Sequence, residues 1–281
     1  MNGNRFKLSK FRLENMVVDP AIVLVAKRGT GKSFITRDIM YHLRRIPGGI
    51  VISPTDRMDA YFKYFFPDIY IHYDINEMIL QKLLYRQQLM KLKYKRKKKQ
   101  GMKVNPSAIL VMDDCLSRKK NWAKGDSVMQ ILMDGRHYKL TYLLTMQYPL
   151  GIGPELRGNF DYIFLLKENI STNRKRLYDN YAGIFPTQGI FERFLNQCTQ
   201  DFRCMVIDNR NNKSDDLQDK VFWFKAVERK FTFGSKSFKD DHHRFYDRNF
   251  QLNKNPFFQN PALLLPRKGR AGEVDFKVDF K

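Results

Sequence analysis

The residues best suited to chemistry lie in the segment 26–33, which reads Ala-Lys-Arg-Gly-Thr-Gly-Lys-Ser. An apolar run, 21–25, precedes this segment, and a periodic helical run, 34–45, follows it. A strand, a glycine-bearing loop and a helix in this order can bind phosphate, because the loop N–H groups turn inward and the positive end of the helix dipole faces the anion. The residues predicted to bind the phosphates of a nucleotide are Arg28, Gly29, Thr30, Gly31, Lys32 and Ser33.

Two side chains of this loop have separate expected roles. Lys32 would reach the β- and γ-phosphates of ATP as a point charge, and the Ser33 hydroxyl would bind the Mg²⁺ that bridges them. Ala26 stands where the P-loop (Walker A) pattern G-x-x-x-x-G-K-[ST] has its first glycine. Its methyl group is small, so we treat the segment as a variant of that pattern; the alternative is an ordinary strand-to-helix turn.

A pair of carboxylates forms the second half of the expected site. The apolar run 108–112 is followed by Asp113 and Asp114, which has the form of a Walker B motif. Asp113 is expected to hold Mg²⁺ through water, and Asp114 to orient and deprotonate an attacking water. Adjacent aspartates also occur at plain strand ends, so the functional interpretation depends on their pairing with the P-loop.

A third strand carries a polar amide at its end. The run 141–145 leads into Met146 and Gln147, where an apolar continuation would be expected. Gln147 is therefore a candidate sensor of the γ-phosphate. The alternative is a solvated strand end.

The segments that must position these residues predict an α/β fold. Apolar runs typical of buried strands alternate with periodic helical segments, which indicates βαβ units and a mostly parallel sheet flanked by helices. Expected helices include an amphipathic one over 76–94, with a basic insertion near 91–105 following it. We divide the chain into a P-loop ATPase domain, 1–229, and an irregular C-terminal extension, 230–281, which packs on the parent domain or docks on a neighbouring subunit or partner.

Composition favours a polyanionic partner. Lys and Arg number 51 against 29 Asp and Glu, a formal net charge of +22, which favours nucleic acid or an anionic membrane surface. The most basic run, 91–99, is either a solvated segment or a nucleic-acid contact. No apolar stretch approaches the ~18 residues of a membrane span, and the first twelve residues lack the apolar region of a secretory signal. The three cysteines lack metal-ligand spacing and are too few for a disulfide framework. We therefore expect an intracellular, reduced protein.

The order of the motifs resembles the DNA-packaging ATPases of large nucleocytoplasmic DNA viruses, the poxvirus-type branch of the FtsK/HerA superfamily. The resemblance covers roughly residues 20–210. It rests on the P-loop, Ser53-Pro54-Thr55, Asp113-Asp114, Gly135-Arg136-His137, Thr145-Met146-Gln147 and Leu156-Arg157-Gly158-Asn159.

This resemblance implies a RecA-like core that assembles into a homo-oligomeric ring, hydrolyses ATP and pumps double-stranded DNA into a capsid. It also implies a capsid or membrane-associated viral partner, and a place in the host cytoplasm, in the viral factory, and in the virion. Family members often carry a glutamate or an aspartate in the catalytic place, so Asp114 is acceptable, although an aspartate reaches less far than a glutamate.

Ring ATPases commonly stabilise the charge that develops on the γ-phosphate with an arginine from the next subunit. Two arginines lie suitably downstream of Asp114. Arg136 is preferred, because its neighbours Gly135 and His137 match the Gly-Arg-His segment on which the family resemblance rests. Arg157 is the alternative. For either residue, the competing interpretation is a surface salt bridge or a DNA phosphate contact.

Two other classes of function remain open. A nucleoside or nucleotide kinase would use the same P-loop, but it needs an acceptor pocket and has little use for a second carboxylate. A DNA-binding protein without motor activity would explain the charge and leave the paired motifs unused.

Overall fold

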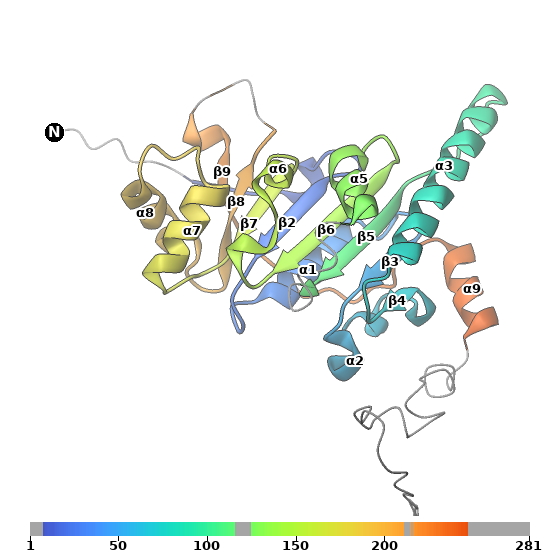
Figure 1. Cartoon of the computed structure of the whole chain (residues 1–281), viewed down its shortest axis with the longest axis horizontal. Coiled ribbons are helices and arrows are strands. Elements are labelled where there is room, and N and C mark those ends of the chain that lie inside the picture. Colours follow the sequence, from blue (N-terminus) through green and yellow to red (C-terminus); the bar gives the residue numbers. More distant parts are fainter. Residues whose placement is uncertain (1–7, 116–124, 211–213, 215, 247–281) are drawn as a thin grey trace, which may run out of the picture.

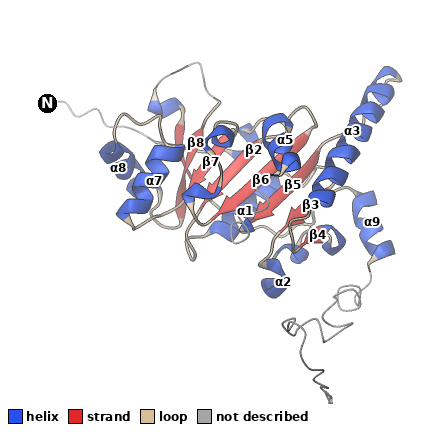
Figure 2. Cartoon of the chain, viewed as in Figure 1, coloured by secondary structure: helices blue, strands red, loops and turns tan. Residues whose placement is uncertain are grey.

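The computed structural model describes residues 8–115, 125–210, 214 and 216–246. Its centre is one sheet of nine strands with helices against both faces (Figures 1 and 2). The strands are β1 (Ser9–Lys10), β2 (Ala21–Val25), β3 (Gly49–Ile52), β4 (Ile71–His72), β5 (Ala108–Asp113), β6 (Leu140–Met146), β7 (Tyr162–Leu165), β8 (Arg203–Asp208) and β9 (Val221–Lys225). They lie in the order β1-β9-β8-β7-β2-β6-β5-β3-β4.

Helices alternate with most of these strands, as expected, and α9 lies beyond the last of them, within the predicted C-terminal extension. The α-helices are α1 (Lys32–His42), α2 (Asp56–Asp59), α3 (Glu77–Lys99), α5 (Asp126–Asp134), α6 (Pro154–Arg157), α7 (Ser171–Tyr181), α8 (Gln188–Cys198) and α9 (Lys236–Phe245). Short 3-10 helices lie at Leu13–Asn15, Phe62–Tyr64, Asp68–Tyr70, Pro149–Gly151 and Leu217–Asp219. No described helix is both long enough and apolar enough to cross a bilayer.

The sheet is mostly parallel, as the sequence predicted. Among its strands, β8 runs against both of its neighbours, β7 and β9. Two helices, α7 and α8, separate β7 from β8, so the chain returns to the edge at which β7 ended. The first residue of β8 therefore lies at the edge where the parallel strands have their carboxyl ends.

Two hydrophobic cores, one on each face, explain the apolar character of the strands. Along β2, Val23 and Val25 pack into the core under α3, α5, α7 and α8. Ile22 and Leu24 pack into the other core, which includes residues of α1 and α9. Successive strand residues point to opposite faces, so a strand covered on both faces must be apolar throughout.

Helix α3 extends beyond its expected end. It continues through the basic run to Lys99 rather than ending near residue 94. Gln87 anchors its middle, because the two N–H groups of this fully buried amide are shared among the carbonyl oxygens of Pro106, Tyr138 and Lys139, which lie 3.0, 2.9 and 3.1 Å from Nε2. Positive side chains in the last turn interact favourably with the helix dipole. The basic half of α3 projects beyond the sheet (Figure 1).

The described part of the predicted C-terminal extension packs on the parent domain. Phe233 is fully buried and its N–H donates to the Phe65 carbonyl at 2.7 Å. The Phe238 ring stacks on Tyr70 with ring centroids 4.2 Å apart. Residues 247–281 lie outside the described part, and the domain division itself stays a prediction.

Candidate nucleotide-binding site

The P-loop has the backbone geometry that the motif requires. It joins the end of β2 to the first turn of α1, and Gly29 and Gly31 adopt φ angles of 76° and 100°. This left-handed region favours glycine. The Thr30 hydroxyl donates to the Lys27 carbonyl at 2.7 Å and closes the loop. Ala26 is buried, and its N–H donates to the Met146 carbonyl at 2.8 Å, so the methyl group fits where the motif has glycine.

The strand order brings the three expected motifs to one place. β6 lies between β2 and β5 and is parallel to both. Val25 is paired with Met146, and Asp113 is paired with Thr145. Gln147, which follows β6, therefore lies between the P-loop and the two aspartates.

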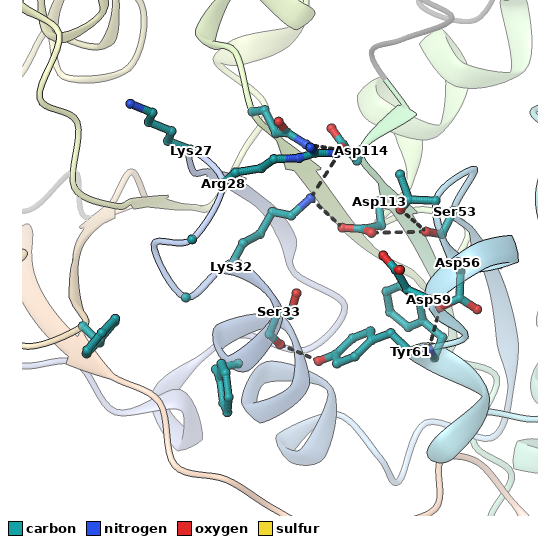
Figure 3. A pocket seen from close by; sticks show the side chains of 17 residues that line it. Lys27, Arg28, Lys32, Ser33, Ser53, Asp56, Asp59, Tyr61, Asp113 and Asp114 are labelled. Atoms are coloured by element: carbon teal, nitrogen blue, oxygen red, sulfur yellow. Dashed lines mark hydrogen bonds and ion pairs between the residues drawn. The ribbon is translucent and has the colours of Figure 1, made fainter.

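The side chains at these strand ends form a connected polar network (Figure 3). Lys32 Nζ lies 3.2 Å from Asp113 Oδ1 and 3.9 Å from Asp114 Oδ2. The Thr145 hydroxyl donates to Asp113 Oδ1, and the Ser53 hydroxyl donates to Asp113 Oδ2 at 3.2 Å. Each oxygen of Asp113 therefore has a neutral donor, and Lys32 lies within ion-pair distance of both carboxylates.

Asp114 has an unusual backbone conformation. Its φ is 51°, in the left-handed region that aspartate enters more readily than most residues. Its N–H donates to the Thr145 carbonyl at 3.2 Å, and Gln147 Nε2 donates to its Oδ2. Strained residues of this kind persist where the surrounding structure holds them. Here Thr145 of β6 holds the backbone of Asp114, and Gln147, directly after β6, holds its side chain.

A cavity of about 370 Å³ connects the P-loop with the acidic strand end. A volume of this order suits a small-molecule ligand. The predicted residues that line it are Arg28, Gly29, Gly31, Lys32, Ser33, Asp113, Asp114 and Gln147. Thr30 does not line the cavity, and its hydroxyl group bonds to the Lys27 carbonyl within the loop. The lining residues that sequence reasoning missed as site residues are Lys27, Phe34, Ser53, Thr55, Asp56, Asp59, Tyr61, Phe62 and Phe202.

Several of the missed residues lie in the segment after β3, 53–62, which forms one wall of the cavity. Asp56 is only 3% exposed, and its Oδ1 accepts a hydrogen bond from the Phe62 N–H at 2.8 Å. Burial raises the pKa of Asp56, and the nearby Asp113 carboxylate raises it further. The Tyr61 hydroxyl donates to the Ser33 carbonyl, and burial raises the pKa of Tyr61. The one sequence signal for this wall was the pair of polar residues, Ser53 and Thr55, that follows β3.

The donor set suits a hard divalent cation. Mg²⁺ prefers oxygen ligands and is usually held by one or two carboxylates, a substrate phosphate and water. The Ser33 side chain and both aspartates line the same cavity as the phosphate-binding loop. The residues present therefore fit Mg²⁺ bound together with a nucleotide, and Ser33 and Asp113 stay the predicted protein ligands.

The two candidate arginine fingers lie outside this cavity within one subunit. Arg136 precedes β6, at the opposite end of that strand from Gln147, and donates to Asp161 Oδ1. Asp161 is 2% exposed, and its other oxygen accepts from the Ala21 N–H at 2.8 Å. Arg157, at the end of α6, donates to Asn180 Oδ1. A finger role for either arginine requires a neighbouring subunit and stays a prediction.

Comparison with known proteins places the chain among viral proteins. It is 60% identical over 247 residues to "Uncharacterized protein L437" of Acanthamoeba polyphaga mimivirus, which covers 88% of this chain and 87% of that protein. It is 31% identical over 243 residues to "Uncharacterized protein 075L" of Invertebrate iridescent virus 6, covering 85% of this chain and 91% of that protein. This chain belongs to the family of these two viral proteins. No protein-family model matches it.

Solved structures show that this chain has the P-loop NTPase fold. The genome packaging NTPase B204 from Sulfolobus turreted icosahedral virus 2, in complex with ATP-gammaS, superposes with a TM-score of 0.54 at 18% identity and covers 76% of this chain and 100% of its own. EssC (ATPases 2 and 3) from Geobacillus thermodenitrificans superposes with a TM-score of 0.53 at 12% identity and covers 80% of this chain and 43% of its own. The predicted fold class is confirmed.

Proposed function

We propose that this protein is a Mg²⁺-dependent ATPase that translocates double-stranded DNA during the packaging of a viral genome. The observation that carries the proposal is the meeting of Lys32, Asp114 and Gln147 in the cavity beside the P-loop. A phosphate-binding loop alone serves many reactions. A loop together with a carboxylate held by a glutamine is suited to hydrolysis, because a base is then available to a water molecule.

The residues divide the reaction between them. The loop N–H groups and Lys32 bind the β- and γ-phosphates, and Ser33 and Asp113 hold Mg²⁺, which when bound neutralises charge on the phosphate oxygens. Asp114 accepts the proton of the attacking water. Gln147 holds the Asp114 carboxylate in one orientation through its hydrogen bond to Oδ2.

The partner we propose is duplex DNA bound through its phosphates. The formal net charge of +22 favours a polyanion. The basic run also forms the end of a rigid helix, α3, which projects beyond the sheet (Figure 1). The exposed basic residues of this run are Lys93, Lys95, Arg96, Lys98 and Lys99. Lysine and arginine contacts to phosphate bind DNA without reading its sequence.

The proposal extends to assembly and place of action. A homo-oligomeric ring would supply Arg136, or Arg157, to the cavity of the adjacent subunit. We place its action in the host cytoplasm, in the viral factory, and in the virion, which the viral relatives support. A capsid or membrane-associated viral partner is part of the same proposal, which the likeness to B204, a genome packaging NTPase, supports. Membership of the poxvirus-type branch belongs to the same proposal.

Phosphate release with and without duplex DNA tests this function. We expect Mg²⁺-dependent ATP hydrolysis that needs no small acceptor and rises when duplex DNA is added. Displacement of a third strand from a DNA triplex then reports movement along the duplex. A kinase would need an acceptor nucleoside or nucleotide, and a passive DNA-binding protein would release no phosphate, so either result would contradict the proposal.

A further inference from the structure

Two exposed aromatic side chains line the cavity at residues that the phosphate chemistry does not use. Phe34 follows Ser33 on α1 and is 59% exposed, and Phe202 precedes β8 and is 73% exposed. They are far apart in sequence. They meet at one cavity because β8 is antiparallel to β7, so the turn before β8 reaches the edge where β2 ends.

The turn that carries Phe202 holds an unfavourable backbone conformation. Asp201 and Phe202 adopt φ angles of 52° and 59°. A bulky residue in this region is a genuine outlier. Arg203 braces the turn, because its Nε donates to the Gln200 carbonyl at 3.0 Å and its Nη2 lies 3.2 Å from Asp201 Oδ2. The chain thus maintains a strained backbone and leaves a large apolar ring in solvent, a combination found at ligand-binding sites.

The strand order indicates how a bound nucleotide is oriented along the cavity. Asp113, Asp114 and Gln147 follow β5 and β6, on one side of the P-loop strand β2. A γ-phosphate must lie on that side, within reach of the base and the metal ligands. β7 and β8 lie on the other side of β2. The sugar and the nucleobase therefore extend toward the end of the cavity at which Phe202 lies.

We propose that Phe34 and Phe202 form a stacking site for the nucleobase of the bound nucleoside triphosphate. This inference rests on the proposed nucleotide site and adds how the base is bound. Every base has an aromatic face, so stacking on phenylalanine binds different bases with little discrimination. The site accordingly accepts ATP and GTP alike, and its aromatic rings contribute to ground-state binding rather than to hydrolysis.

Binding of three ligands to the full chain tests the proposal. We would titrate ATP, GTP and inorganic tripolyphosphate, each with Mg²⁺, into the wild type and the variants by calorimetry. Phe202→Ala should weaken ATP and GTP by the same factor, roughly 5- to 150-fold, and should leave tripolyphosphate, which has no base, unchanged. Phe34→Ala should give the same pattern, and Phe202→Trp should retain tight binding. Phe245→Ala, which removes another exposed phenylalanine on α9, is the matched control.

Phe202→Gly separates stacking from folding. Glycine adopts a positive φ without strain, so this variant should keep or raise the midpoint of thermal unfolding while losing base affinity. Unchanged ATP affinity in both Phe202→Ala and Phe202→Gly would overturn the stacking site and leave the proposed function intact. An equal loss of tripolyphosphate affinity would also overturn it, because the ring would then act through the P-loop. A wild type that binds neither ATP nor tripolyphosphate would refute the nucleotide site itself.

Discussion

The side-chain amide of Gln147 donates a hydrogen bond from Nε2 to Oδ2 of Asp114. The bond joins the ends of the neighbouring parallel strands β6 and β5. Lys32 Nζ lies 3.9 Å from the same oxygen. The carboxylate that we propose as the base is thus oriented by the residue that follows β6 and faces the phosphate-binding lysine at the start of α1.

Gln147→Ala should lower the turnover number for ATP hydrolysis and leave nucleotide affinity nearly unchanged. The reason is that Asp114 keeps its charge but loses the partner that orients it. We expect a loss of roughly 10- to 100-fold, the size usual when an orienting hydrogen bond is removed. Gln147→Glu should lose as much, since two carboxylates would then face each other. Steady-state kinetics and calorimetry measure the two effects; undiminished turnover in both variants would exclude a positioning role.

Lys32→Ala and Asp114→Asn should both be inactive for different reasons. Removal of Lys32 takes away the charge that meets the phosphates, so affinity and turnover fall together. Asp114→Asn removes the base while keeping most of the shape, so it should bind ATP and lose roughly 10²- to 10⁴-fold in turnover. Undiminished hydrolysis by Asp114→Asn would refute its assignment as the base.

Arg136→Ala should bind ATP normally and fail to hydrolyse it. Mixing it with Lys32→Ala protein should restore some activity, at junctions that pair an intact cavity with an intact arginine. Arg136 also pairs with the buried Asp161, so Arg136→Ala alone could lose activity through structural damage. Mixing would not repair such damage, so rescue by mixing distinguishes a finger from a structural role. Asp161 keeps its hydrogen bond from the Ala21 N–H, so the variant should fold. If Arg157→Ala loses activity and is rescued while Arg136→Ala stays active, the finger is Arg157.

Neutralising the end of α3 should reduce the salt dependence of DNA binding. The logarithm of the binding constant falls linearly with the logarithm of salt concentration, and the slope becomes shallower by about 0.9 for each DNA phosphate that the protein no longer neutralises. We expect Lys95→Gln, Lys98→Gln and Lys99→Gln together to flatten this slope equally for unrelated duplexes. The matched control changes the exposed Lys63, Lys225 and Lys236 to Gln and removes the same charge elsewhere. If the two triple variants show the same salt dependence of DNA binding, the basic end of α3 does not contact DNA and is only solvated.

Asp56→Asn should stabilise the fold at neutral pH and not at low pH. Burial raises the pKa of Asp56 more than the hydrogen bond from the Phe62 N–H lowers it, so the folded state favours the protonated form. Ionisation at neutral pH therefore costs folding free energy, and this cost disappears once Asp56 is protonated in both the folded and unfolded states.

Asparagine keeps an oxygen for the Phe62 N–H and carries no charge. Thermal unfolding at neutral pH and below pH 3.8, the ordinary pKa of aspartate, measures the difference. Asp59→Asn changes an exposed carboxylate on the same helix and is the control. An equal shift of the unfolding midpoint at both pH values would contradict the role of burial.

The local elements could be read from the sequence because their signals are local. Neighbouring residues are enough to set the positive φ angles of Gly29 and Gly31 and the apolar runs of β2, β5 and β6. The same holds for helix α1, which begins at Lys32. Helix α3 shows where this fails. The periodic pattern predicted its end near residue 94, but the helix continues to Lys99, where the positive side chains of the last turn interact favourably with the helix dipole.

The sequence by itself determined that a phosphate-binding loop, a pair of aspartates and a terminal glutamine each follow an apolar strand in an α/β chain. Only the tertiary structure decided that β6 lies between β2 and β5, and that this places Gln147 against Asp114. It also decided that the reversed strand β8 brings Phe202 to the cavity, and that Tyr61 contacts the P-loop helix. Strand order and direction depend on contacts between residues distant in sequence, for which the packing of both faces of the sheet supplies the free energy.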